Sequence, residues 1–176
     1  MRKALALAFS LLLLHPVAAT AHGPTRQKVV ETVEINAPAD KVWAVIGNFQ
    51  DMSWHPAVAS TAGEGGNAVA AKRRLTLKGG GVIDEALTKH DASAKRFAYE
   101  ITDVDVKVLP VKNYSSSISV SGEGSKSVVE WRGAFYRGFM NNDPPPELSD
   151  EAAVKAVTGI YRAGLDALKK QLEAGG

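Results

Sequence analysis

The stretch SDEAAVKAVTGIYRAGLDALKKQLEAGG (149–176) predicts one long amphipathic helix at the end of the chain. Ser149 is a favourable N-cap residue, and Asp150 and Glu151 place negative charge in the first helical turn. Apolar side chains then recur at helical spacing, at Val154, Val157, Ile160 or Tyr161, Leu165, Leu168 and Leu172. The pattern extends over roughly 22 residues, and its apolar stripe has to be covered by another element of the fold.

Two glycines, Gly159 and Gly164, lie among the apolar positions of this helix. Glycine is unfavourable inside a helix, so both positions need a structural reason. Either the glycines allow the helix to lie close against its neighbours, or they leave space beneath it. The sequence leaves both alternatives open.

The pattern from residue 58 to residue 135 is that of short strands. About six extended segments alternate apolar and polar residues: Val58–Glu64, Ala70–Lys78, Val82–His90, Arg96–Asp103, Val106–Ser121 and Ser127–Phe135. The turns that separate them are rich in glycine or begin with aspartate: Gly65-Gly66-Asn67, Gly79-Gly80-Gly81, Asp91-Ala92-Ser93 and Gly122-Glu123-Gly124. Connections this short make neighbouring strands antiparallel.

The segment before residue 58 predicts one further strand, Gln27–Asn36, followed by short helical structure. Pro38 and Asp40 suit the first turn of a short helix. Its apolar side consists of Val42, Trp43, Val45 and Ile46. The expected order is therefore one strand, two short helices, about six antiparallel strands and the long helix, an α+β fold. Such a sheet completes a core only where it curves around the helix.

The N-terminus has the three parts of a secretory signal peptide. Met1-Arg2-Lys3 is positively charged, Ala4–Leu14 is apolar, and Ala19-Thr20-Ala21 matches the A-x-A cleavage pattern. We therefore expect residues 1–21 to be a signal peptide, residues 22–176 to be a single domain, and the mature protein to be periplasmic. No second apolar run in the sequence is long enough to predict a membrane span.

The composition argues against several classes of function. The sequence holds 21 Lys and Arg residues against 19 Asp and Glu, and loss of Arg2 and Lys3 with the signal peptide balances them. A neutral chain is a poor candidate for binding nucleic acid or anionic membranes. Without cysteine there are no disulfides, thiol nucleophiles, thiolate metal sites or covalently attached haem. No catalytic-triad, metal-binding or phosphate-binding motif is present, so we expect no catalytic residue, no metal and no cofactor.

Three short motifs resemble the START-like, helix-grip superfamily, which includes polyketide cyclases and lipid-transfer domains. They are Asn36-Ala-Pro-x-x-x-Val-Trp43, Trp54-x-Pro56 and Gly81-Val-Ile-Asp-Glu85. The resemblance extends over essentially the whole mature chain. It implies a curved antiparallel sheet of about six to seven strands wrapped around the long C-terminal helix, with a cavity between them.

Within this superfamily, longer stretches are similar to the MxaD-like accessory proteins of bacterial methanol oxidation. They include GNFQDMSWHPAV (47–58), TLKGGGVIDEALTKHD (76–91) and NNDPPPELSDEAAVKAVTGIYRAGLDAL (141–168). This similarity implies a non-enzymatic periplasmic protein that assists a quinoprotein methanol dehydrogenase or its interaction with cytochrome c. We expect a monomer. The alternative is a protein that binds or transports a small hydrophobic ligand, or a polyketide-cyclase-like enzyme that uses the cavity.

The resemblance to cavity-binding members places four residues on the inner face of the sheet: Glu85, Tyr114, Ser116 and Trp131. Strand alternation agrees for Tyr114 and Ser116, which share one face of their strand. A carboxylate such as Glu85 is costly to bury without a partner, and Arg74 is the partner that we expect. Two alternatives remain. These residues line a ligand pocket, or they fill a closed core in which Glu85 binds Arg74 or Lys107.

The turn at residues 47–60 and the loop Arg137–Leu148 are expected to close the cavity. In the turn, Trp54 should pack inward, and His55 should be a solvent-facing or hydrogen-bonded residue at the rim. The residues expected at the mouth are His55, Gly79, Gly80, Gly81, Tyr136, Phe139 and Met140, either as a seal or as a contact surface for the dehydrogenase or cytochrome. We also predict four buried structural residues: Trp43, Trp54, Val157 and Leu165.

Overall fold

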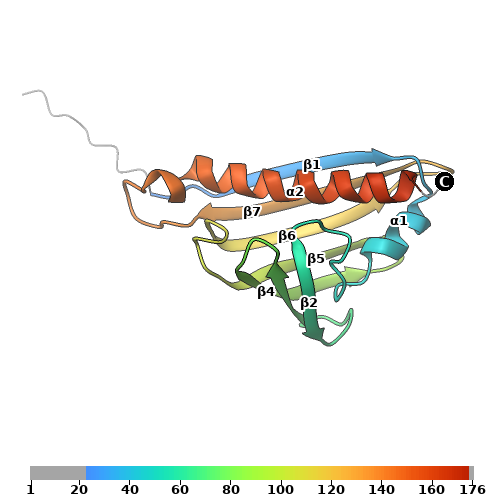
Figure 1. The fold of residues 1–176 in the computed structure, drawn as a ribbon, viewed down its shortest axis with the longest axis horizontal. Coiled ribbons are helices and arrows are strands. Elements are labelled where there is room, and N and C mark those ends of the chain that lie inside the picture. Colours follow the sequence, from blue (N-terminus) through green and yellow to red (C-terminus); the bar gives the residue numbers. More distant parts are fainter. Residues whose placement is uncertain (1–22, 175–176) are drawn as a thin grey trace, which may run out of the picture.

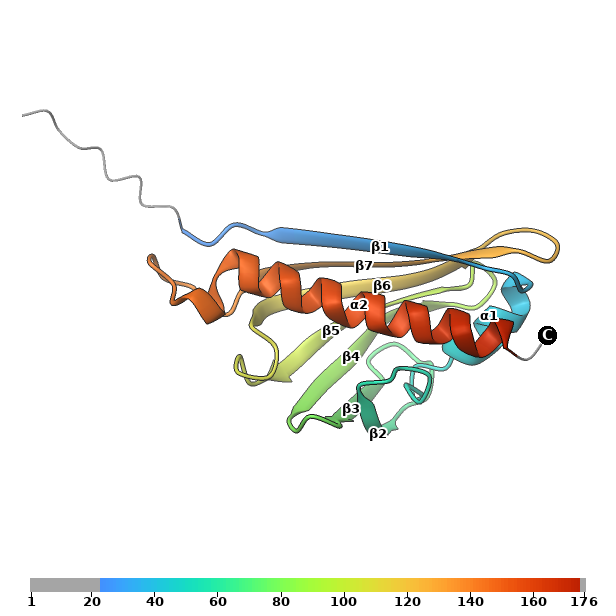
Figure 2. The same cartoon turned by 45° about the horizontal axis from the view of Figure 1, so that its top comes forward.

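The computed structural model describes residues 23–174, so the expected signal peptide at residues 1–21 lies outside the described residues. Seven strands form one antiparallel sheet in the order β1-β7-β6-β5-β4-β3-β2. The long helix α2 lies along the side toward which the sheet curves (Figure 1), and the strands turn around it (Figure 2). The elements are β1 Gln27–Ile35, α1 Ala39–Ile46, β2 Val58–Glu64, β3 Lys72–Leu77, β4 Val82–Asp91, β5 Arg96–Val104, β6 Val111–Ser121, β7 Ser127–Arg137, the 3-10 turn η1 Pro146–Leu148 and α2 Asp150–Glu173.

Helix α2 begins and packs as its sequence predicts. The Ser149 hydroxyl accepts a hydrogen bond from the backbone N–H of Ala152 at 3.1 Å, which satisfies one free donor of the first turn. At the side of the helix, Arg162 donates to the Glu31 carboxylate of β1 at 3.1 Å. The face that the sheet covers consists of Ala153, Val157, Tyr161, Gly164, Leu165, Leu168 and Leu172. Burial of this stripe is the main favourable contribution to holding the helix in the sheet.

The segment between β1 and β2 forms only one of the two short helices that we expected. After α1 the chain makes consecutive turns instead of a second helix. The Asn48 side chain accepts the backbone N–H of Gln50 at 3.1 Å, and the Asp51 side chain accepts that of Ser53 at 2.8 Å. Such local side-chain bonds stabilise turns in competition with helix, which explains the difference.

The strand that we expected to begin at Val106 begins only at Val111. The Asp105 side chain accepts the backbone N–H of Lys107 at 2.8 Å, which favours a turn at this point. Pro110 has no N–H to donate to a neighbouring strand. Residues 105–110 therefore form a loop between β5 and β6.

The two glycines of α2 have different surroundings. A Cβ atom on Gly164 would lie 2.5 Å from His55 Cδ2 and 2.9 Å from Trp131 Cζ3, so only glycine fits without displacement. A Cβ atom on Gly159 would meet nothing within 4 Å, and this residue is exposed. Gly164 thus allows close packing of the helix, whereas Gly159 has no such role.

Three of the four residues predicted to be buried are in the core: Trp54, Val157 and Leu165. The prediction for Trp43 was wrong, because this residue is only partly buried. One side of its ring packs on His90 and Phe97, at centroid distances of 5.5 and 6.2 Å. The short helix α1 crosses the end of the sheet, and the sheet covers only part of the indole.

Three connections lie together at the end of the sheet away from α1 (Figures 1 and 2). They are the β3–β4 hairpin, the β5–β6 loop and the connection from β7 to η1. A Cβ atom on Gly81 would meet the Val108 side chain at 2.5 Å, and one on Gly138 would meet the Pro110 backbone at 3.2 Å. The β5–β6 loop therefore touches both of its neighbours. In the part of the chain that the structure describes, no helix has the length and hydropathy to cross a membrane.

Candidate ligand cavity

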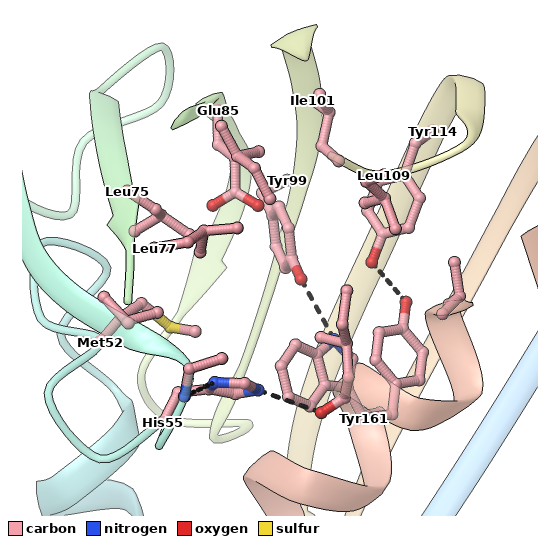
Figure 3. A pocket seen from close by; sticks show the side chains of 16 residues that line it. Met52, His55, Leu75, Leu77, Glu85, Tyr99, Ile101, Leu109, Tyr114 and Tyr161 are labelled. Atoms are coloured by element: carbon pink, nitrogen blue, oxygen red, sulfur yellow. Dashed lines mark hydrogen bonds between the residues drawn. The ribbon is translucent and has the colours of Figure 1, made fainter. Parts of the chain in front are cut away.

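A cavity of about 70 Å³ lies between the sheet and α2, lined by residues of β2 to β7, the turn after α1, the β5–β6 loop and the helix. Figure 3 shows the side chains around it. Much of the wall is apolar and includes Leu75, Leu77, Ile83, Ile101, Leu109 and Val157. The polar groups that reach it come from Glu85, Tyr99, Tyr114, Trp131, Tyr161 and His55. The cavity is therefore a small apolar space with a few polar groups at its boundary.

The buried carboxylate of Glu85 is paired with Arg73 and not, as we expected, with Arg74. Arg73 Nε lies 2.5 Å from Glu85 Oε2, and Arg73 Nη1 donates to the Phe49 carbonyl at 2.7 Å. In the register of β3 and β4, Arg73 is opposite Glu85 and Arg74 is opposite Asp84. Because side chains alternate between the faces, Arg74 points outward and binds Asp84 with two nitrogens at 2.7 Å each.

The Arg73–Glu85 pair is almost fully shielded from water, with side-chain exposures of 1% and 5%. The guanidinium carbon lies 4.2 Å from the ring centre of Phe49 and 5.1 Å from that of Tyr99. Burial raises the pKa of Glu85, and the charge and hydrogen bond of Arg73 oppose this rise. Removing either partner would leave an isolated charge in the core, which is strongly destabilising.

Hydrogen bonds connect the aromatic residues of the wall into one network. The hydroxyls of Tyr114 and Tyr161 are 2.5 Å apart, and Ser116 Oγ lies 3.0 Å from that of Tyr161. Trp131 Nε1 donates to Ser116 Oγ at 3.0 Å and to the Tyr99 hydroxyl at 3.1 Å. Tyr114 and Trp131 line the cavity, whereas Ser116, which we also expected to line it, lies behind them and holds the network together.

The three buried phenols have raised pKa values. Burial raises the pKa of Tyr99 to about 12, and the nearby Glu85 carboxylate adds to the effect. Burial also raises the pKa of Tyr114 and of Tyr161 well above the ordinary value. These hydroxyls stay protonated at neutral pH, so they can donate hydrogen bonds but cannot act as general bases.

His55 is a hydrogen-bonded residue, one of the two positions that we expected, and it is buried and not solvent-facing. Its side chain is 2% exposed. Its Nδ1 accepts the backbone N–H of Ala57 at 3.2 Å, and Nε2 lies 3.0 Å from the Ile160 carbonyl. These partners favour the tautomer with its proton on Nε2. Burial lowers the pKa of His55, and the bond to Ile160 opposes this shift.

The other residues expected at the mouth do not line the cavity. The expectation for Tyr136 was wrong, because it occupies the outer face of β7, where Arg26 lies 5.7 Å from its ring centre. Phe139 is partly buried and Met140 is exposed, both in the loop that follows β7. Gly79–Gly81 form the tip of the β3–β4 hairpin at the same end of the sheet.

Three residues of the site were not among the predicted ones: Arg73, Tyr99 and Tyr161. Counting by twos from the apolar Phe97 would have found Tyr99, because alternate residues of a strand share a face. Tyr161 lies one helical turn from both Val157 and Leu165, a spacing that favours it over Ile160 as the core residue. Among residues 23–174 there is no group of three or more His, Asp or Glu side chains that could hold a metal ion.

Residues 26–173 match the family model described as polyketide cyclase / dehydrase and lipid transport. The chain belongs to this family. Its predicted helix-grip architecture is confirmed by the seven-stranded antiparallel sheet and the long C-terminal helix. A search among curated proteins found no match to this sequence.

Several solved structures are similar to this member of the polyketide cyclase / dehydrase and lipid transport family. An uncharacterized protein from Bacillus thuringiensis is 31% identical with a TM-score of 0.70, covering 84% of this chain and 99% of its own. The protein XoxI from Bacillus cereus is 32% identical with a TM-score of 0.70, covering 83% and 95%. Norcoclaurine synthase from Thalictrum flavum, solved with dopamine and hydroxybenzaldehyde, is 17% identical with a TM-score of 0.65, covering 96% and 99%. At that identity, the synthase shows a common fold alone.

Proposed function

We propose that the protein is a periplasmic, non-enzymatic accessory protein of methanol oxidation, which assists a quinoprotein methanol dehydrogenase or its interaction with cytochrome c. The similarity of its longer sequence stretches to the MxaD-like proteins supports this system. The structural observation that carries the proposal is the small size of the interior cavity, about 70 Å³. The protein then acts as a monomer through its surface and not by converting a substrate inside the fold.

The size of the cavity argues against catalysis on an aromatic or larger substrate. Norcoclaurine synthase was solved with dopamine and hydroxybenzaldehyde, which both contain a benzene ring. A buried cavity that binds benzene measures about 150 Å³, more than twice the volume available here. The 70 Å³ cavity of this chain does not accommodate such a ring without displacing its wall.

The polar groups around the cavity also have partners that limit their chemistry. Both nitrogens of His55 are engaged by backbone groups, and Glu85 is bound to Arg73. A general base has to reach the proton that it removes from a substrate, and its pKa should lie near the working pH. The raised pKa of Tyr99, about 12, does not meet that condition. The interior therefore resembles a hydrogen-bonded core more than a catalytic site.

We place the contact with the dehydrogenase or cytochrome at the end of the sheet that carries the β3–β4 hairpin and the loop after β7. Met140 exposes 41% of its surface there, and Phe139 is partly buried beside it. Gly79–Gly81 form the neighbouring hairpin tip. Three consecutive prolines stiffen the loop, Pro144 to Pro146, which lowers the entropy lost when it docks.

A calorimetric titration tests this contact. The Phe139→Ala, Met140→Ala double variant should lose at least tenfold in affinity for purified methanol dehydrogenase or cytochrome c, with unchanged thermal unfolding. The matched control is Val30→Ala, Val69→Ala, which removes two exposed apolar side chains elsewhere and should bind as the parent does. Equal affinities of parent and both double variants would place the contact elsewhere. Absence of any binding by the parent to either partner would refute the proposed function.

The remaining cavity favours a second candidate function, the binding of a small molecule. An apolar cavity with a buried carboxylate at its edge is an unusual feature to retain in a well-packed core. The ligand would have to be smaller than benzene.

Export to the periplasm, which both candidates share, is tested by N-terminal sequencing of the protein from a periplasmic extract.

A further inference from the structure

One oxygen of the buried Glu85 carboxylate has no partner within the described residues. Oε2 is bound to Arg73, whereas Oε1 accepts no hydrogen bond from residues 23–174. Glu85 is 5% exposed and lines the cavity, and Figure 3 shows its carboxylate pointing inward beside Leu75 and Tyr99. Arg73 Nη2, on the other side of the pair, is fully buried and has no partner among the described residues. Glu85 Oε1 therefore keeps a free acceptor position, which a hydrogen-bonding occupant of the cavity can fill.

The volume of the cavity sets the size of that occupant. A water molecule needs about 10–15 Å³ of cavity volume, and benzene occupies a cavity of about 150 Å³. By proportion to the six carbon atoms of benzene, the 70 Å³ available here corresponds to about three non-hydrogen atoms. The cavity therefore has room for a molecule larger than water, but not for a lipid or an aromatic compound.

The chemistry of the wall sets its polarity. Oε1 of Glu85 requires a hydrogen-bond donor, and side chains such as Leu75, Ile83 and Leu109 require an apolar remainder. A cationic donor is disfavoured because Arg73 already neutralises the carboxylate and a second buried cation would lose its hydration. A neutral hydroxyl on a very short carbon chain satisfies both requirements.

We propose that the cavity binds a neutral alcohol of one to three carbon atoms, whose hydroxyl donates a hydrogen bond to Glu85 Oε1. This inference rests on the second candidate function given above and names its ligand class. The ligand would enter from a surface groove beside α2. His55, Ala57 and Ile160 line both that groove and the cavity, so a small displacement of His55 and Ile160 would connect the two.

The expected affinity for so small a ligand is low, so the assay has to detect weak binding. The ceiling on binding strength per non-hydrogen atom puts the Kd of a three-atom ligand at about 0.5 mM or weaker. We would titrate the ¹⁵N-labelled protein with ethanol up to about 0.5 M, roughly a thousandfold above that limit, and follow the indole N–H signal of Trp131 by NMR. This group lies in the wall of the cavity. Ethanol should shift the signal saturably.

Dimethyl ether is the matched control ligand, because it has the same atoms as ethanol but no hydroxyl hydrogen. It should bind at least tenfold more weakly, since it cannot donate to Glu85. Benzyl alcohol carries a hydroxyl but is too large, and should not produce a saturable shift. Equal affinities for ethanol and the ether would overturn the proposed hydrogen bond. A linear, non-saturating response to ethanol would show that the cavity holds water only and would overturn the proposal.

A pair of variants tests the location. Val157→Ile adds one methyl group to the wall of the cavity, whereas Val154→Ile adds the same group on the same helix outside it. The first should weaken ethanol binding at least tenfold, and the second should leave it unchanged. Binding that is equal in both would place the alcohol elsewhere. If Val157→Ile fails to fold, the ligand series on the parent still decides. None of these measurements involves the dehydrogenase or cytochrome, so their failure and the failure of the accessory function are distinguishable.

Discussion

Substitution of Gly164 tests whether α2 packs closely against its neighbours, provided that the effect of helix propensity is measured separately. Its missing side chain leaves room for His55 and Trp131, whose atoms would lie 2.5 and 2.9 Å from an added Cβ. Gly159, five residues earlier on the same helix, is exposed and has no neighbour within 4 Å of that position. The two glycines therefore form a matched pair for substitution by alanine.

The expected magnitudes follow from two opposed effects. Alanine is favoured over glycine in a helix by about 1 kcal/mol, and this gain should apply to both variants. An added methylene group in a packed core costs about 1–3 kcal/mol, and this cost should apply to Gly164→Ala alone. Gly159→Ala should thus be more stable than the parent, and the two variants should differ by about 1–3 kcal/mol.

Urea unfolding followed by far-ultraviolet circular dichroism measures this difference. With a slope of about 2 kcal/mol per molar urea, the midpoints should lie roughly 0.5–1.5 M apart. The slopes themselves should be equal, because the surface exposed on unfolding is almost unchanged. If both alanine variants gain the same stability, His55 and Trp131 can move aside freely and the close packing described here is refuted.

Three further predictions concern the core. Arg73→Met should destabilise the protein by about 3–5 kcal/mol in urea unfolding, because Glu85 is left as an isolated buried charge. Arg74→Met, at an exposed ion pair, should change little, and equal losses would contradict the pairing seen here. Because burial lowers the pKa of His55, the unfolded chain takes up this proton more readily below about pH 6.5. Stability should therefore fall as the pH falls below that value, by at most about 1.4 kcal/mol per pH unit, and His55→Gln should have a flatter curve than the parent. Trp54→Ala should lose about 3–5 kcal/mol, and an unchanged urea midpoint would show that the indole is not packed in the core.

Most of the fold could be predicted from the sequence because its signals are local. Alternation and glycine turns marked the strands, and a capped apolar stripe marked α2, with its start at Ser149. The errors lie where local signals compete. Asx-type hydrogen bonds from Asn48 and Asp51 replaced the second short helix with turns, and Pro110 with Asp105 delayed the start of β6.

The site was only partly predictable, because a one-residue error on a strand reverses the face. Glu85, Tyr114 and Trp131 line the cavity. The alternation of side chains along each strand does not by itself determine how β3 is aligned with β4. That register places Arg73, not its neighbour Arg74, opposite the carboxylate. The burial of His55 was missed for a different reason. Alternation of faces holds for strands, and this residue lies in consecutive turns that direct both it and Trp54 into the core.

The small cavity of this family member is a consequence of how its glycines and aromatic residues are distributed. Gly133 on β7 leaves room for the Tyr161 hydroxyl, which an added Cβ would contact, and Gly164 does the same for His55 and Trp131. Trp131 and Tyr161 then stack at a centroid distance of 4.4 Å across the space between sheet and helix. Large rings thus occupy much of the volume that a helix-grip fold encloses. Both rings are hydrogen-bonded to Ser116, and Tyr161 is also hydrogen-bonded to Tyr114, so they cannot move aside without losing buried hydrogen bonds. This chain therefore retains the helix-grip fold of its family and leaves a cavity of only about 70 Å³ between the sheet and the helix.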